Sequence, residues 1–79
     1  MQTITVTASN KGNVTLLSIN NKCIAHIGKD INNIGRYAGR VNHAGGVMCN
    51  NMRYSEAVEF ITDAIERLFA GFGLDVKFE

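Results

Sequence analysis

Four side chains of this sequence could together bind a metal ion: Cys23, His26, His43 and Cys49. Two thiolates and two imidazoles are a ligand set of structural zinc. However, Cys23 and His26 lie three residues apart in a run with the pattern of a strand, where residues at an odd offset point to opposite faces. The chain also has no CxxC pair. We therefore predict no metal site, and interpret the two cysteines as reduced, buried thiols rather than a disulfide framework.

Two other groupings could carry out catalysis. Cys49 and His43 could form a nucleophile and its base, but such a pair also needs an orienting group, an oxyanion site and a cleft. The carboxylates Glu59, Asp63 and Glu66 recur at helical spacing, which is typical of a solvated helix face. No apolar pocket is evident that would separate their pKa values for acid–base work. The sequence thus predicts a non-enzymatic protein with no catalytic, metal-binding or cofactor-binding residues.

Residues 34–46 interleave glycines with Arg36, Tyr37 and Arg40. Such a segment can bind phosphate or stack on a base. It matches neither the GxxxxGK[ST] nor the GxGxxG pattern. Three or four cations would support salt-sensitive, non-specific binding to nucleic acid but no reading of base sequence. Nucleic-acid binding is therefore kept as the alternative to a solvated face.

The first 28 residues predict a three-stranded antiparallel meander. Residues 3–7 alternate threonine with isoleucine or valine, and residues 14–19 and 22–27 are further apolar runs. Two-residue turns are expected at Lys11-Gly12 and at Asn20-Asn21, where asparagine tolerates a positive φ.

These turns fix a register. Val6 is then expected beside Leu17 and Ile24, and Ile4 beside Ile19, so that one face of the sheet is continuously apolar. That face needs a cover.

Asp30 to His43 has apolar residues at helical spacing behind an aspartate that could cap a helix. Gly35 and Gly39 each cost a helix about 1 kcal/mol, so an irregular segment is the alternative. A regular helix would place four cationic or titratable residues on one basic face: Lys29, Arg36, Arg40 and His43. Val47 to Cys49 is interpreted as a short fourth strand or an extended connection.

Ser55 to Ala70 has the strongest helical periodicity in the chain, with Ser55 as the expected N-cap. Gly71 is expected as a left-handed C-cap with Phe72 packing back on the helix. Leu74 to Phe78 alternates as a last strand. The predicted fold is one α+β domain over residues 1–79: an antiparallel meander of three strands plus one or two more, covered by this helix and a second, shorter one.

Composition narrows the class of protein. With 79 residues, 46% hydrophobic and 19% charged, the chain is expected to form one small core that would gain from a partner subunit such as a second copy. No run is long and apolar enough to span a bilayer, and the first residues lack the features of a signal peptide, so we expect a cytoplasmic protein. The net charge of +1 is unevenly distributed along the chain: residues 29–53 carry +3 and residues 54–79 carry −4.

The threonine-rich first strand Thr3 to Thr7, the meander through Ile27, the helix Ser55 to Ala70 and the last strand together resemble the small phage-encoded anti-CRISPR proteins. The likeness covers the whole chain at the level of size, architecture and charge, without a diagnostic motif. It implies a non-enzymatic inhibitor in the host cytoplasm that binds a CRISPR-Cas effector and blocks target binding or nuclease recruitment. The contact surface would be the acidic face of Glu59, Asp63 and Glu66, or the basic face of Arg36, Tyr37 and Arg40.

About 25 residues from Met52 into the helix are also similar to the small HicB-type antitoxin domain. An antitoxin would have a co-encoded small basic toxin as its partner. The segment from Gly28 to Asn51 departs from that compact arrangement, so the antitoxin is the runner-up.

Overall fold

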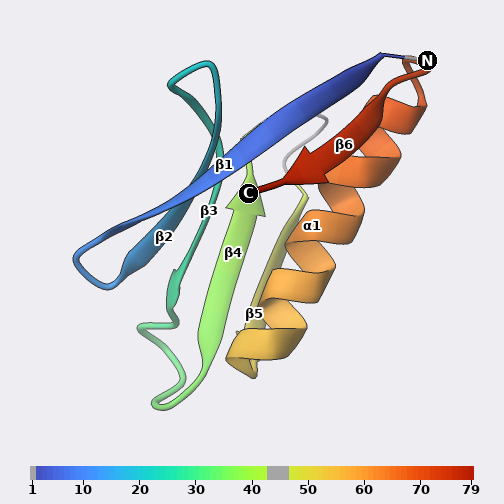
Figure 1. The fold of residues 1–79 in the computed structure, drawn as a ribbon. Helices are drawn as coiled ribbons and strands as arrows, with labels where there is room; N and C mark the ends of the chain where they lie inside the picture. The colour runs from blue at the N-terminus through green and yellow to red at the C-terminus, as the bar shows by residue number, and fades with distance from the viewer. Residues whose placement is uncertain (1, 43–46) are drawn as a thin grey trace.

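The computed structural model describes residues 2–42 and 47–79, which form one six-stranded sheet and one helix. In chain order the elements are β1 (Thr3–Lys11), β2 (Val14–Ile19), β3 (Lys22–Lys29), β4 (Tyr37–Val41), β5 (Met48–Met52), α1 (Tyr54–Ala70) and β6 (Asp75–Phe78). The strand order in the sheet is β5-β4-β3-β2-β1-β6. The sheet curls into a half-barrel, and α1 lies along its concave side (Figure 1). The predicted α+β fold with two helices and a three-stranded meander is therefore wrong.

The first two hairpins form as the turn residues require. Asn20 and Asn21 have φ values of 51° and 66°, which confirms the two-residue turn between β2 and β3. The β1–β2 turn lies one residue later than predicted, because Lys11 pairs with Val14 and Gly12 has a φ of +66°. Ala8 instead of Val6 is consequently opposite Leu17. A shift of two residues keeps every side chain on its own face, so Val6 and Leu17 still belong to the core.

The predicted helix over residues 30–43 is wrong. Residues 30–36 form a loop, and β4 follows with Gly39 and Val41 buried toward α1. The helical period depended on Ile31 and Ile34, which are fully exposed in the structure. Gly35 has a φ of +77°, which a helix cannot contain. A loop and β4 therefore replace the second helix, and β4 extends the antiparallel meander. The strand predicted as one alternative for Val47 to Cys49 is present as β5, which extends further, to Met52.

Asp30 organises the loop between β3 and β4. Its Oδ1 accepts a hydrogen bond from the Asn32 N–H at 2.9 Å. Its Oδ2 accepts from Asn33 Nδ2 at 3.0 Å and from the Asn51 N–H of β5 at 2.8 Å. The Asp30 N–H donates to the Arg36 carbonyl at 2.9 Å, which closes the loop. The Asp30 carboxylate thus accepts backbone N–H bonds in a turn, as it would at a helix N-terminus, and one of these bonds connects the turn to the edge strand β5.

The hydrogen bonds of Asp30 predict a pH effect on stability. The bond from Asn33, followed by the backbone bonds from Asn32 and Asn51, lowers the pKa of this carboxyl below its ordinary value of 3.8. A lowered pKa stabilises the folded state above the unfolded-state pKa, and this contribution is lost as the pH falls through the folded-state pKa. We expect Asp30→Ala to lower the melting temperature at pH 7, with the difference from the natural chain shrinking below about pH 4. Thermal unfolding followed by circular dichroism at several pH values measures this, and a difference that does not depend on pH would contradict it.

Helix α1 begins one residue before its predicted cap. The N-cap is Arg53, whose N–H donates to Glu56 Oε1 at 3.1 Å. Ala57, Ile61 and Ile65 are buried against the sheet, which confirms the predicted apolar stripe. The helix therefore covers the concave face as expected.

The end of α1 differs from the prediction. Gly71 has a right-handed φ of −62°, and the left-handed residue is Gly73, with a φ of +74°. The Leu74 N–H donates to the Phe69 carbonyl at 3.0 Å, so the chain turns two residues later than expected. Phe72 consequently does not pack back and is 73% exposed.

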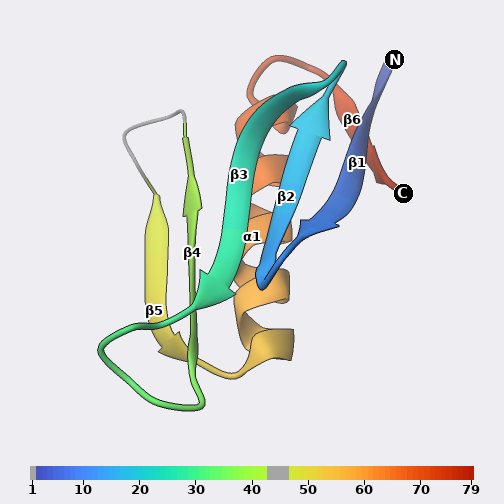
Figure 2. The same ribbon diagram turned by 90° about the vertical axis from the view of Figure 1, so that its left-hand side faces the viewer.

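The last strand, β6, was predicted, but the strand that it pairs with was not. It pairs in parallel with β1, with Thr3 beside Asp75 and Val6 beside Phe78. Helix α1 connects β5 at one edge of the sheet to β6 at the other, and this crossover permits the parallel direction (Figures 1 and 2). The sheet is therefore mixed. Among the residues that the structure describes, nine buried side chains form the core between α1 and the sheet: Val6, Leu17, Ile24, Ala25, Ile27, Val41, Ala57, Ile61 and Ile65.

Candidate functional site

The candidate zinc ligands lie differently from the expectation. A β-bulge near Ile24 pairs Cys23 with Ser18 and His26 with Leu16, so both side chains lie on the convex face of the sheet. The prediction that Cys23 and His26 point to opposite faces of the sheet is therefore wrong. Cys49 packs against the core on the concave side, and His43 lies outside the described residues. Within residues 2–42 and 47–79 no three His, Cys, Asp or Glu residues cluster as a metal site would require, and the lack of a metal site stays a prediction.

The thiols also differ from each other. Cys49 is half-buried as predicted, and burial raises the pKa of its thiol above 9.0. Cys23 is exposed, contrary to the prediction, and its Sγ donates to the Ala25 carbonyl at 3.3 Å.

The predicted basic face does not exist as one surface. Arg36 ends the loop after β3, and Arg40 lies on the convex face of β4, opposite His26. Tyr37 packs against the core, with its ring 5.1 Å from that of Tyr54 and tilted by 71°. Four residues of a strand span about 13 Å, so the two arginines are not a compact cluster. The structure brings neither of them together with the Tyr37 ring.

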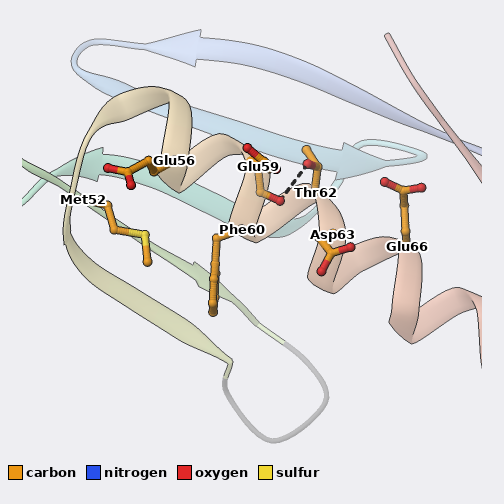
Figure 3. Close-up of a pocket in the computed structure, with 7 residues that line it drawn as sticks. All are labelled: Met52, Glu56, Glu59, Phe60, Thr62, Asp63 and Glu66. Carbon is orange, nitrogen blue, oxygen red and sulfur yellow. Dashed lines mark hydrogen bonds between the residues drawn. The ribbon is translucent and has the colours of Figure 1, made fainter.

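The predicted acidic residues do come together. Glu59, Asp63 and Glu66 line a single groove along the exposed side of α1, with a volume of about 600 Å³. Figure 3 shows Asp63 beside Phe60, and Glu66 on a further turn of α1, pointing the other way. Phe60 of α1 and Met52 of β5 supply apolar surface in the same groove. Two further residues complete the lining: Glu56 and Thr62. We call these seven residues the acidic groove.

Two of the four carboxylates of the acidic groove, Glu59 and Glu66, have no side-chain partner among the described residues, whereas Glu56 accepts a hydrogen bond from the Arg53 N–H at 3.1 Å. Arg67 Nε lies 3.0 Å from Asp63 Oδ2, and this exposed pair is the one ion pair among the residues that the structure describes. Pairs of this kind contribute at most about 1 kcal/mol. The Thr62 hydroxyl donates to the carbonyls of Val58 and Glu59 at 2.9 and 3.2 Å, so it is already satisfied by the helix backbone (Figure 3). The groove therefore offers negative charge and two apolar side chains.

Four members of the acidic groove were not predicted as site residues: Met52, Glu56, Phe60 and Thr62. The sequence could have indicated Phe60 as a surface-binding residue, because it is large and apolar but lies outside the buried stripe of the helix. It is 37% exposed. Met52 carried no signal, since it comes from a different element and reaches the groove only through the β5–α1 connection.

A second groove lies where the β2–β3 hairpin meets the end of α1. It has a volume of about 760 Å³ and is lined mainly by apolar side chains: Ile19, Asn20, Lys22, Ile24, Leu68, Phe69 and Phe72. In both ribbon views this end of the molecule is opposite the start of α1 (Figures 1 and 2). We call it the apolar groove.

Comparison with known proteins gives no assignment. No family model, curated protein or solved structure matches this chain. Among the described residues, no helix has the length and apolar character that crossing a membrane requires. The candidate function therefore depends on the acidic groove itself.

Proposed function

We propose that this domain is a non-enzymatic, cytoplasmic binding protein whose acidic groove binds a basic surface of a partner protein. The observation that supports the proposal is the arrangement in one groove of four carboxylates with exposed Phe60 and half-buried Met52. An apolar centre with a charged rim is the usual composition of a protein-binding surface. Carboxylates around it steer a cationic partner and reject an anionic one.

The resemblance to anti-CRISPR proteins suggests the first partner to test. CRISPR-Cas effectors hold nucleic acid in positively charged channels, which a row of carboxylates can occupy in competition with the phosphates. On this proposal the domain blocks target binding or nuclease recruitment without any chemical step. The HicB-type antitoxin, which would bind a small basic toxin through the same groove, remains the alternative.

The direct test is binding to purified CRISPR-Cas effector complexes, measured by calorimetry and by target-DNA gel shift. We expect Glu59→Lys, Asp63→Lys and Glu66→Lys together to weaken binding by at least about 100-fold, because like charges then face each other across the interface. The matched control reverses two exposed acids outside the groove, Asp75→Lys and Glu79→Lys, and is expected to bind like the natural chain. If the groove variant binds normally, the contact lies elsewhere.

The nucleic-acid alternative makes an opposite prediction. Direct binding to DNA or RNA would weaken steeply with salt and would be lost in Arg36→Ala, Arg40→Ala. Arg36 lies in the loop before β4 and Arg40 lies within the strand, so the two form no compact cluster. Since Tyr37 is also packed against Tyr54, we expect no complex in a low-salt gel shift. If the natural chain forms a salt-sensitive complex with nucleic acid and the double variant does not, the function is nucleic-acid binding by the convex face of the sheet.

A further inference from the structure

The loop between β3 and β4 presents two isoleucines to solvent. Ile31 is 94% exposed and Ile34 is 103% exposed, the largest values among the exposed large apolar residues. Neither contributes to the core. A connection that only joins two antiparallel strands needs as few as two residues, whereas this loop has seven. The extra length places two apolar side chains beyond the end of the sheet.

The loop is braced as a binding element would be. Asp30 accepts three hydrogen bonds that fix the backbone from Asn32 to Asn33 and attach it to β5. The Arg36 N–H donates to the Asn33 carbonyl at 3.1 Å. Isoleucine itself is stiff at χ1. Insertion of Ile31 and Ile34 into a partner therefore loses little conformational entropy, which is the condition for a few side chains to contribute strongly to affinity.

The charges favour a particular partner. Exposed Lys29 and Arg36 flank the isoleucines, while Asp30 between them is taken up by its own hydrogen bonds. The acidic groove offers the complement, with Phe60 and Met52 for the isoleucines and carboxylates for the two cations. The apolar groove at the other end fits less well, because its charged residue is Lys22.

The loop lies at the end of the molecule where the acidic groove begins, at Met52 and Glu56, and the groove then extends along α1 to Glu66. The Asn51 N–H that binds Asp30 comes from β5, and the chain enters α1 three residues later. Figure 2 shows the loop beside the start of α1. A two-fold axis at this end can therefore bring each loop to the groove of the other chain, which gives a closed dimer with two equivalent contacts.

We propose that the chain forms a homodimer in which Ile31 and Ile34 of each copy insert into the acidic groove of the other. The dimer and the proposed function share the acidic groove, and this is the only way in which the dimer rests on the proposed function. A second copy of the chain and a basic partner protein therefore compete for the groove. Self-association is then a means of masking the partner-binding surface until a tighter partner displaces it.

Sedimentation velocity of the purified chain alone, over a range of concentration, tests the dimer. We expect a monomer–dimer equilibrium that weakens between about 50 mM and 500 mM salt, because the flanking charges are exposed. Ile31→Ser with Ile34→Ser, or Glu59→Lys with Asp63→Lys, should each lower the association constant by at least about 100-fold. The controls Asp75→Lys with Glu79→Lys, and Phe72→Ser, should dimerise like the natural chain, and circular dichroism checks that every variant folds.

Mixing the two defective variants gives the decisive measurement. The isoleucine variant keeps an intact acidic groove and the groove variant keeps an intact loop, so their mixture should form a one-to-one dimer through a single contact. The proposal is overturned if the mixture stays monomeric, if the natural chain is monomeric throughout, or if Phe72→Ser is the substitution that prevents dimerisation. A monomer that instead co-sediments with anionic lipid vesicles through Ile31 and Ile34 would also overturn it. Since no partner protein is present, failure of the proposed function leaves these results unchanged.

Discussion

A Gly39→Val chain is expected to lose a large part of its free energy of unfolding. Gly39 lies on β4 under α1, and a Cβ at this position would stand 2.9 Å from Ile61 Cγ1 and 3.1 Å from the His26 carbonyl oxygen. Ile61 is fully buried and the His26 oxygen belongs to the neighbouring strand, so neither has room to move. We expect Gly39→Ala to cost about 1–3 kcal/mol and Gly39→Val at least about 3 kcal/mol. A domain of 79 residues has only about 4–12 kcal/mol in total. Urea unfolding measured by circular dichroism gives these values.

Gly28→Ala is the matched control for this close contact. Gly28 lies on the adjacent strand β3, and its added Cβ would meet Val14 Cγ2 at 3.4 Å, an ordinary van der Waals distance. Its stability should change by less than about 0.5 kcal/mol.

A rescue experiment tests whether Ile61 is the obstacle. Ile61→Ala alone should cost about 2–5 kcal/mol, because it leaves a cavity under α1. Adding Gly39→Ala to that variant should then cost at least about 1 kcal/mol less than it does in the natural chain, since the new methyl group enters the cavity. Additive costs would count against direct contact between the two positions.

Sequence patterns predicted the elements whose signals are local. The period of Ala57, Ile61 and Ile65 identified α1, because those residues contact the core directly. Asn20-Asn21 identified the β2–β3 turn, because both residues have positive φ values. Residues 30–36 were misassigned because Ile31 and Ile34 have helical spacing yet never reach the core. Spacing alone does not distinguish apolar residues that pack inside from those that face solvent.

Two further errors have a non-local cause. The alternation in β6 indicated which side chains are buried, but strand direction depends on the path of α1 across the sheet. The bulge at Ile24 reverses the expected side of the residues after it, so that His26 comes to the same face as Cys23. Nothing in the alternation of residues 22–27 indicates an extra residue. In the candidate site, the carboxylates were predictable because they share one helix, whereas Met52 joins them only after folding.

Removal of residues 74–79 is expected to unfold the domain or make it aggregate. Strand β6 covers the outer edge of β1: the Asp75 N–H donates to the Gln2 carbonyl at 3.0 Å, and the Glu79 N–H to the Val6 carbonyl at 2.9 Å. Val76 and Phe78 pack against the core beside fully buried Val6. Loss of these two half-buried side chains removes about 2–4 kcal/mol, before the lost hydrogen bonds are counted. The bare β1 edge then becomes available to other chains. Light scattering and circular dichroism of the truncated chain measure both effects.

The control for the truncation keeps the strand but removes its exposed side chains. Asp75→Ala with Lys77→Ala leaves the backbone pairing with β1 in place, since both side chains point away from the core. Its stability should stay within about 0.5 kcal/mol of the natural chain. If the truncated chain unfolds at the same urea concentration as this control, the parallel β1–β6 pair contributes nothing, and the half-barrel is held by the five-strand meander and α1 alone.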